Sequence, residues 1–135
     1  QGLDLINEVM LAPGDTVLIE EATYGGCLTR FQRLGVTAVG IKLDEQGMRT
    51  DHLAETLEKL AAEGTKPKFI YVIPTVQNPT ASIMPLERRK ELLRLAEQYD
   101  VAVIEDETTI IVPASRDAIR QPDGCIDVIT KETKQ

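Results

Sequence analysis

Apolar positions along the chain follow helical and extended spacings in turn, which predicts alternating helices and strands. A first helix is expected from Leu3 to Leu11, after which Pro13 and Gly14 turn the chain. Compact apolar runs predict four buried strands, at residues 16–20, 36–43, 68–73 and 101–104. Amphipathic segments between and around them predict three more helices, at residues 26–34, 50–63 and 86–99.

Two of these helices begin at residues typical of helix starts. Thr50 or Asp51 is expected to cap the helix that runs to Glu63. Pro85 suits the first position of the following helix, because its missing N–H would have no partner there. The apolar stripe of that helix is expected to comprise Leu92, Leu93, Ala96 and Tyr99.

The order of the elements predicts the fold class. Strands that alternate with helices of this length imply βαβ units with right-handed crossovers. The expected fold is therefore α/β, with three α/β/α layers around a mostly parallel sheet. Residues 1–112 are expected to form this unit, and residues 113–135 are a weakly patterned C-terminal stretch. Ligands of such sheets bind beyond the carboxyl ends of the strands, so the residues that follow each strand are the functional candidates.

Charge and hydropathy narrow the function classes. The 135 residues carry 15 Lys and Arg against 22 Asp and Glu, a net charge of −7 that argues against nucleic-acid contact by this segment. Arg88, Arg89 and Lys90 lie beside Glu87 and Glu91 and predict a solvated helix face with local ion pairs. No apolar run approaches the roughly 20 residues of a membrane span. A soluble, cytoplasmic protein is expected, and the start at Gln1 rather than Met suggests a piece of a longer chain.

The first candidate is Tyr24, which follows the first strand and precedes Gly25 and Gly26. These glycines would let a ligand or another backbone approach closely. The ring could stack on a flat heterocycle, or it could pack over the next helix and cover the core. Its position alone favours packing.

The second candidate is Asn78, in the long loop that follows the third strand. Pro74 and Pro79 restrict the shape of this loop, so the amide could be held in one orientation. Its NH₂ group could donate to a phenolate-like oxygen. Asn-Pro is also a common turn sequence, and the two interpretations are evenly balanced.

The third candidate is Asp106, which follows the last predicted strand beside Glu105 and Glu107. A partly buried carboxylate there could pair with a protonated ring nitrogen and keep it charged. Acids at a strand end are more often simply solvated, and position alone favours that interpretation.

A metal site is not expected. His52 is the only histidine, and it lies in the first turn of a polar helix, which favours a surface role. Cys27 and Cys125 have no metal-ligand spacing.

Several short motifs together resemble the large domain of fold-type I, pyridoxal-phosphate-dependent aminotransferases of class I/II. The resemblance is greatest to the 2-aminoadipate and aromatic aminotransferase branch, and it covers roughly the first four-fifths of the chain. Its motifs are QGLDL at 1–5, PGD-x-V-x-x-E at 13–20, TYGG at 23–26, PTVQNPT at 74–80, ERRKELL at 87–93 and VIED at 103–106.

The resemblance implies a cofactor, pyridoxal 5'-phosphate, and a role for each strand-end residue. Tyr24 would stack on the cofactor ring, Asn78 would hydrogen-bond its phenolic oxygen, and Asp106 would pair with its pyridine nitrogen. It also implies an amino acid and a 2-oxo acid as substrates of the intact protein, and a homodimer. For Tyr24 it favours ring stacking over packing on the core, and for Asp106 it favours pairing with the ring nitrogen over simple solvation.

The chain also departs from the family pattern. Ala81 stands where the family usually has Gly, and Thr109 where it commonly has Tyr. The motif around the catalytic lysine has no clear copy. Lys134 is its nearest match, and the catalytic residue is therefore unassigned. The phosphate-binding loop would precede Gln1. The chain by itself is accordingly expected to be inactive as a transaminase.

Two other origins are consistent with the sequence. The segment could belong to the aminotransferase-like, cofactor-sensing domain of a GntR-type transcription regulator, which the sequence upstream of Gln1 would reveal. It could also be a non-catalytic remnant whose C-terminal stretch is read out of frame. A Ser-x-x-Lys motif in another reading frame would support that origin.

Overall fold

The computed structural model describes residues 2–23 and 25–106. Tyr24, Thr109, Lys134 and the predicted stretch 113–135 lie outside the described residues. Within them, four strands form a parallel sheet in the order β2-β1-β5-β6. The strands are β1 (Thr16–Glu20), β2 (Thr37–Ile41), β5 (Phe69–Val72) and β6 (Ala102–Glu105).

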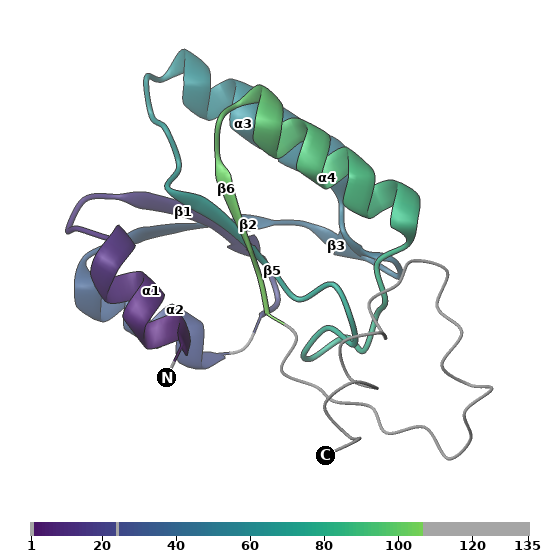
Figure 1. Cartoon of the computed structure of the whole chain (residues 1–135), viewed down its shortest axis with the longest axis horizontal. Helices are drawn as coiled ribbons and strands as arrows, with labels where there is room; N and C mark the ends of the chain where they lie inside the picture. The colour runs from purple at the N-terminus through teal and green to yellow at the C-terminus, as the bar shows by residue number, and fades with distance from the viewer. Residues whose placement is uncertain (1, 24, 107–135) are drawn as a thin grey trace, which may run out of the picture.

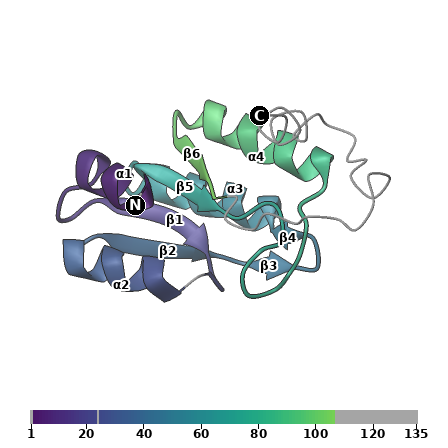
Figure 2. The same ribbon diagram turned by 60° about the horizontal axis from the view of Figure 1, so that its bottom comes forward.

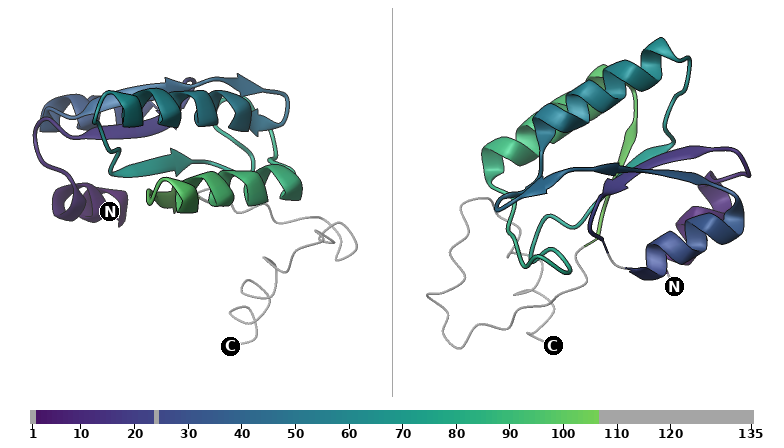
Figure 3. Two further views of the ribbon diagram at one scale, coloured as in Figure 1. Left: turned by 90° about the horizontal axis from the view of Figure 1, so that it is seen from above. Right: turned by 180° about the vertical axis from the view of Figure 1, so that it is seen from behind.

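In the described part of the chain, four helices cover the two faces of this sheet. They are α1 (Gly2–Met10), α2 (Gly25–Leu34), α3 (Thr50–Ala62) and α4 (Leu86–Gln98). Helices α1 and α2 lie on one face, and α3 and α4 lie side by side on the other (Figures 1 and 3). The predicted three-layer α/β/α arrangement is therefore confirmed. None of the described helices has the length and apolar content needed to cross a membrane.

The two central strands, β1 and β5, are buried on both faces. In β1, Val17 and Ile19 pack in one apolar cluster with Phe31 of α2, whereas Leu18 packs in a second cluster with residues of α3 and α4. Strand β5 divides in the same way, since Phe69 joins the first cluster and Ile70 the second. Successive side chains of a strand point to opposite faces, so an uninterrupted apolar run is what a sheet covered on both sides requires.

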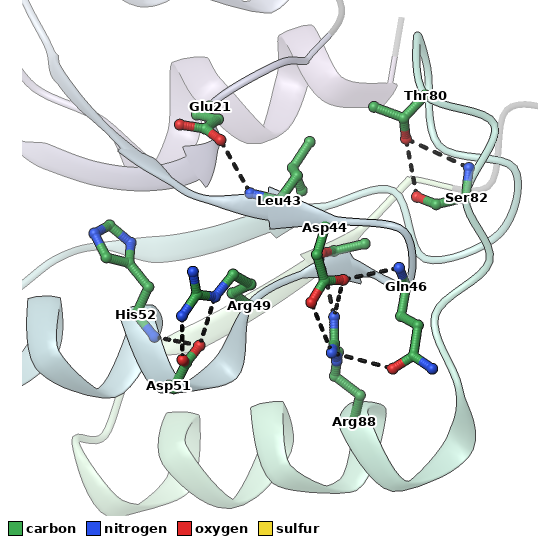
Figure 4. A network of polar contacts seen from close by, with 11 residues as sticks. Glu21, Leu43, Asp44, Gln46, Arg49, Asp51, His52, Thr80, Ser82 and Arg88 are labelled. Carbon is green, nitrogen blue, oxygen red and sulfur yellow. Dashed lines mark hydrogen bonds and ion pairs between the residues drawn. The ribbon is translucent and has the colours of Figure 1, made fainter.

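A short hairpin was not predicted. The predicted strand 36–43 ends at Ile41, and the chain continues into an antiparallel pair, β3 (Leu43–Asp44) and β4 (Gly47–Met48). Arg88 of α4 reaches this hairpin and donates to both carboxylate oxygens of Asp44, at 2.5 and 3.0 Å (Figure 4). Strands of two residues are too short for their periodicity to be recognised in a sequence.

Three helix details were predicted wrongly. Arg49, not Thr50 or Asp51, occupies the N-cap position of α3, and it makes no side-chain capping bond. Pro85 lies just before α4 rather than at its first position. In α4 the buried side is formed by Leu92, Leu95 and Ala96, while Leu93 is 53% exposed. Residues three and four apart share a helix face, which places Leu95 beside Leu92 and turns Leu93 outward.

Adjacent leucines of α4 provide a test of this packing. Leu92→Ala is expected to lower the free energy of unfolding by about 2–5 kcal/mol, because Leu92 is 2% exposed within the core between α4 and the sheet. Leu93→Ala, one residue further on, is expected to change it by no more than about 0.5 kcal/mol. Urea unfolding of both variants measures the difference, and equal losses would show that the orientation of α4 is wrong.

Candidate functional site

The carboxyl ends of β5 and β6 bring two of the three predicted site residues to the same edge of the sheet. The two strands are paired neighbours, with Val72 opposite Glu105. Asp106 directly follows β6, and its N–H donates to the Val72 carbonyl at 2.9 Å. Asn78 lies in the loop between β5 and α4, which passes beside the β3–β4 hairpin (Figure 2). Tyr24, the third predicted site residue, lies outside the described residues.

Asp106 is half-buried and has a side-chain partner that was not predicted. The phenol of Tyr71 donates a hydrogen bond to Asp106 Oδ2 at 2.5 Å. Tyr71 is fully buried in β5, so its position is fixed and it holds the Asp106 carboxylate in one orientation. Asp106 Oδ1 accepts no hydrogen bond from the other described residues, so this oxygen could accept one from a ligand. The tyrosine in the run KFIYVI was the sequence feature that could have indicated this partner.

Asn78 is exposed, and no hydrogen bond joins its side chain to another described residue. Its loop contains two residues other than glycine with positive φ, Val76 at 51° and Ala81 at 59°. Ala81, which stands where the family usually has Gly, therefore adopts a left-handed conformation that glycine would reach more easily. This conformation costs of the order of 1 kcal/mol for a residue with a Cβ, so other contacts must hold the loop in this shape.

Gln77, directly before Asn78, supplies most of those contacts. Its side chain is 1% exposed. The amide nitrogen donates to the Ala22 carbonyl at 2.5 Å and to Glu20 Oε2 at 3.1 Å. Its oxygen accepts from the backbone N–H and the hydroxyl of Thr80, at 2.9 and 2.7 Å. Gln77 thereby ties the loop after β5 to the segment after β1.

Glu20, the last residue of β1, is fully buried. Besides the Gln77 amide, its Oε2 accepts the N–H of Ile73 at 3.2 Å. Burial raises the pKa of the Glu20 carboxyl to about 7, against the lowering effect of these two donors. Neither Glu20 nor Gln77 was predicted as a site residue. One indication of such a role was present in the sequence, since the segment TVLIE ends in an acid although its other residues are apolar or carry a hydroxyl.

The other side of the loop is held by Arg89 of α4. Its guanidinium donates to the Met84 carbonyl at 3.0 Å and to the Thr75 hydroxyl at 3.1 Å, which lie near opposite ends of the loop. The predicted solvated cluster is therefore correct for Lys90, which pairs with Glu87 at 2.8 Å, but wrong for Arg88 and Arg89. Their tertiary partners lie too far away along the chain to be seen in a helical pattern.

His52 is half-buried at the start of α3, where its Nδ1 accepts the N–H of Lys42 at 3.2 Å. It therefore links the helix to the segment after β2. Among residues 2–23 and 25–106, no group of three or more His, Cys, Asp or Glu side chains could hold a metal ion.

Comparison with known proteins identifies the family. The model for aminotransferases of class I and II matches residues 1–115 of the chain. The chain belongs to the aminotransferase class I and II family. This match covers the whole described sheet and the edge that carries Asn78 and Asp106.

Individual relatives agree with this family. An aromatic-amino-acid aminotransferase 1 from Thermococcus litoralis is 46% identical over 106 residues, which are 78% of this chain and 25% of that protein. A mitochondrial kynurenine/alpha-aminoadipate aminotransferase from Bos taurus is 35% identical over 79% of this chain and 27% of its own length. A Pyrococcus horikoshii kynurenine aminotransferase, solved in complex with PMP, superposes with a TM-score of 0.76 at 44% identity, over 78% of this chain and 26% of that one. The chain thus spans about a quarter of the length of these relatives.

The buried Glu20 carboxyl gives the fold a defined pH dependence. Its pKa is raised from 4.5 to about 7 in the folded chain, so its contribution to stability is complete below pH 4.5 and is lost as the pH rises through 7. The loss corresponds to about 3 kcal/mol. Glu20→Gln cannot ionise and is expected to abolish this part of the pH dependence.

The measurement is the free energy of unfolding of both proteins across this pH range. The difference between wild type and Glu20→Gln removes the contributions of the other titrating groups. A difference that does not change with pH would contradict the raised pKa.

Proposed function

We propose that this chain forms the cofactor-ring side of the large domain of an aminotransferase that passes an amino group from an amino acid to a 2-oxo acid. Family membership supports the reaction class. The observation that carries the proposal is the position of Asp106, half-buried after β6 and oriented by the Tyr71 phenol. A carboxylate fixed at the carboxyl edge of a parallel sheet, where the loop that carries Asn78 also begins, is suited to hold a polar heterocycle.

Membership in this family implies pyridoxal 5'-phosphate as the cofactor, and the described residues fit its ring. Asp106 Oδ1, which accepts no hydrogen bond from the other described residues, would accept from the protonated pyridine nitrogen. The exposed NH₂ group of Asn78 would donate to the phenolic oxygen, and Tyr24 would stack on the ring. When bound, the cofactor supplies an electron-accepting ring, and its protonated nitrogen is what makes it one. The part assigned to Asp106 is to keep the proton on that nitrogen.

The substrates are proposed from the relatives, and the assembly from membership in the family. Several relatives are named for aromatic amino acids, kynurenine or aminoadipate, which supports an aromatic or aminoadipate-like amino acid as the substrate. The protein is proposed to be a cytoplasmic homodimer that acts in amino acid metabolism. Lys134 is outside the described residues, and amino transfer is not proposed for the 135-residue chain by itself.

Asp106→Asn is expected to weaken binding of pyridoxamine phosphate about 10-fold or more, because a hydrogen bond to a charged group is worth roughly 1.5–3 kcal/mol. Asn78→Ala is expected to weaken it several-fold, since it removes one neutral donor. Isothermal titration calorimetry measures both affinities. Pyridoxamine phosphate has no aldehyde, so it reports non-covalent binding without reacting with surface lysines.

The control is Asp100→Asn. Asp100 lies before β6, at the opposite edge of the sheet, where it pairs with Lys66 on the surface. Its φ is 52°, a conformation that asparagine tolerates. Affinity in this variant is expected to stay within about twofold of wild type, because exposed ion pairs contribute little. Wild-type affinity in Asp106→Asn would refute the proposed role of Asp106.

A further inference from the structure

The Asn78 loop depends on a side chain from a different strand. Glu20 lies at the end of β1, more than fifty residues before Asn78 in the sequence, and it is fully buried. Its Oε1 has no hydrogen-bond partner among the described residues. Its Oε2 accepts two N–H groups, from Ile73 and from the Gln77 side chain. Burying a carboxyl group costs free energy unless its oxygens are hydrogen-bonded, so the two bonds to Oε2 offset part of the cost of placing Glu20 here.

Gln77 transmits this contact to the loop through both its side chain and its backbone. Its N–H donates to the Ser82 carbonyl at 2.9 Å, and its carbonyl accepts the N–H of Ala81 at 2.6 Å. These bonds span the loop on either side of Asn78, which is itself exposed. With the backbone of Gln77 fixed, the direction in which the chain leaves toward Asn78 is fixed as well.

We propose that Glu20 and Gln77 are positioning residues for the cofactor, which orient the Asn78 amide toward the phenolic oxygen and act only through Asn78. The inference rests on the proposed function and adds two residues to its site. Glu20 provides the hydrogen-bond acceptor for the Gln77 side chain, and the backbone bonds of Gln77 hold the loop in place. Arg89 restrains the ends of the loop from α4, whereas Glu20 and Gln77 restrain its centre.

The chemistry of the Glu20 contact supplies a conservative variant. Glu20→Gln retains an acceptor oxygen for the N–H groups of Ile73 and Gln77. Glu20→Ala removes the acceptor and leaves both donors unsatisfied in the interior. Glu21→Ala is the matched control, because Glu21 is the adjacent acid but is exposed. Within the described part of the chain, its side chain accepts from Leu43 N of the hairpin, at 3.1 Å, and not from the Asn78 loop (Figure 4).

The first measurement is hydrogen exchange of the full chain without cofactor. In Glu20→Ala, the amides of residues 77–84 are expected to exchange about 10-fold faster, while the amides of β5 keep their protection. Glu20→Gln and Glu21→Ala are expected to exchange as wild type does in this loop. Unchanged loop exchange in Glu20→Ala would overturn the inference.

The second measurement is a double-mutant cycle on the affinity for pyridoxamine phosphate. Glu20→Ala is expected to lose several-fold in affinity, as Asn78→Ala does, and Glu20→Gln to restore it. Because Glu20 acts through Asn78, the Glu20→Ala, Asn78→Ala double variant should bind no more weakly than Asn78→Ala alone. A merely structural role for Glu20 would instead give losses that multiply.

The outcomes separate the two proposals. This inference alone is overturned if the wild type binds pyridoxamine phosphate but the affinity losses of Glu20→Ala and Asn78→Ala multiply in the double variant. It is also overturned if Glu20→Gln behaves like Glu20→Ala. Failure of the unmodified chain to bind pyridoxamine phosphate overturns the proposed function, and this inference with it. If Glu20→Ala does not fold, Gln77→Met takes its place in the same cycle, since it removes the amide but keeps a similar volume.

Discussion

Burial of both faces of the parallel sheet is the constraint that organises this chain. Every residue of β1 and β5 is buried, and alternate side chains enter the two apolar clusters beneath α2 and beneath α3 and α4. Because parallel strands all end at the same edge, polar side chains that follow them are collected there. The ends of β1, β5 and β6 contribute Glu20, Asn78 and Asp106 to this edge.

That edge combines exposed groups that could meet a ligand with buried groups that orient them. Asp106 is oriented by Tyr71, and the Asn78 loop is held by Glu20 and Gln77. The loop also contains Ala81 in a left-handed conformation, whose cost must be offset by those hydrogen bonds. The two arrangements differ in how the buried residue acts. Tyr71 bonds one carboxylate oxygen of Asp106 directly, whereas Glu20 and Gln77 hold the backbone of the loop that carries Asn78.

Local periodicity was sufficient to predict the fold, but it was insufficient for tertiary contacts. The four strands and four helices were recognised because each has a clear spacing, and the rule for strand ends then selected Asn78 and Asp106. The orientation of α4 was partly wrong because two consecutive leucines fit either phase of the helix. Glu20 and Arg89 were missed because their partners lie far away in the sequence or across a loop. Glu20 was predicted only as the end of a buried strand, and the structure buries its carboxyl as well.

The most direct test of the account is the protonation state of the cofactor nitrogen when it is bound. Pyridoxamine phosphate labelled with ¹⁵N in its ring would be added to the chain at a pH where the free ring nitrogen is neutral, and its NMR shift recorded. The account predicts a protonated nitrogen in wild type and a neutral one in Asp106→Asn. A neutral nitrogen bound to wild type, or a protonated one in Asp106→Asn, would contradict it.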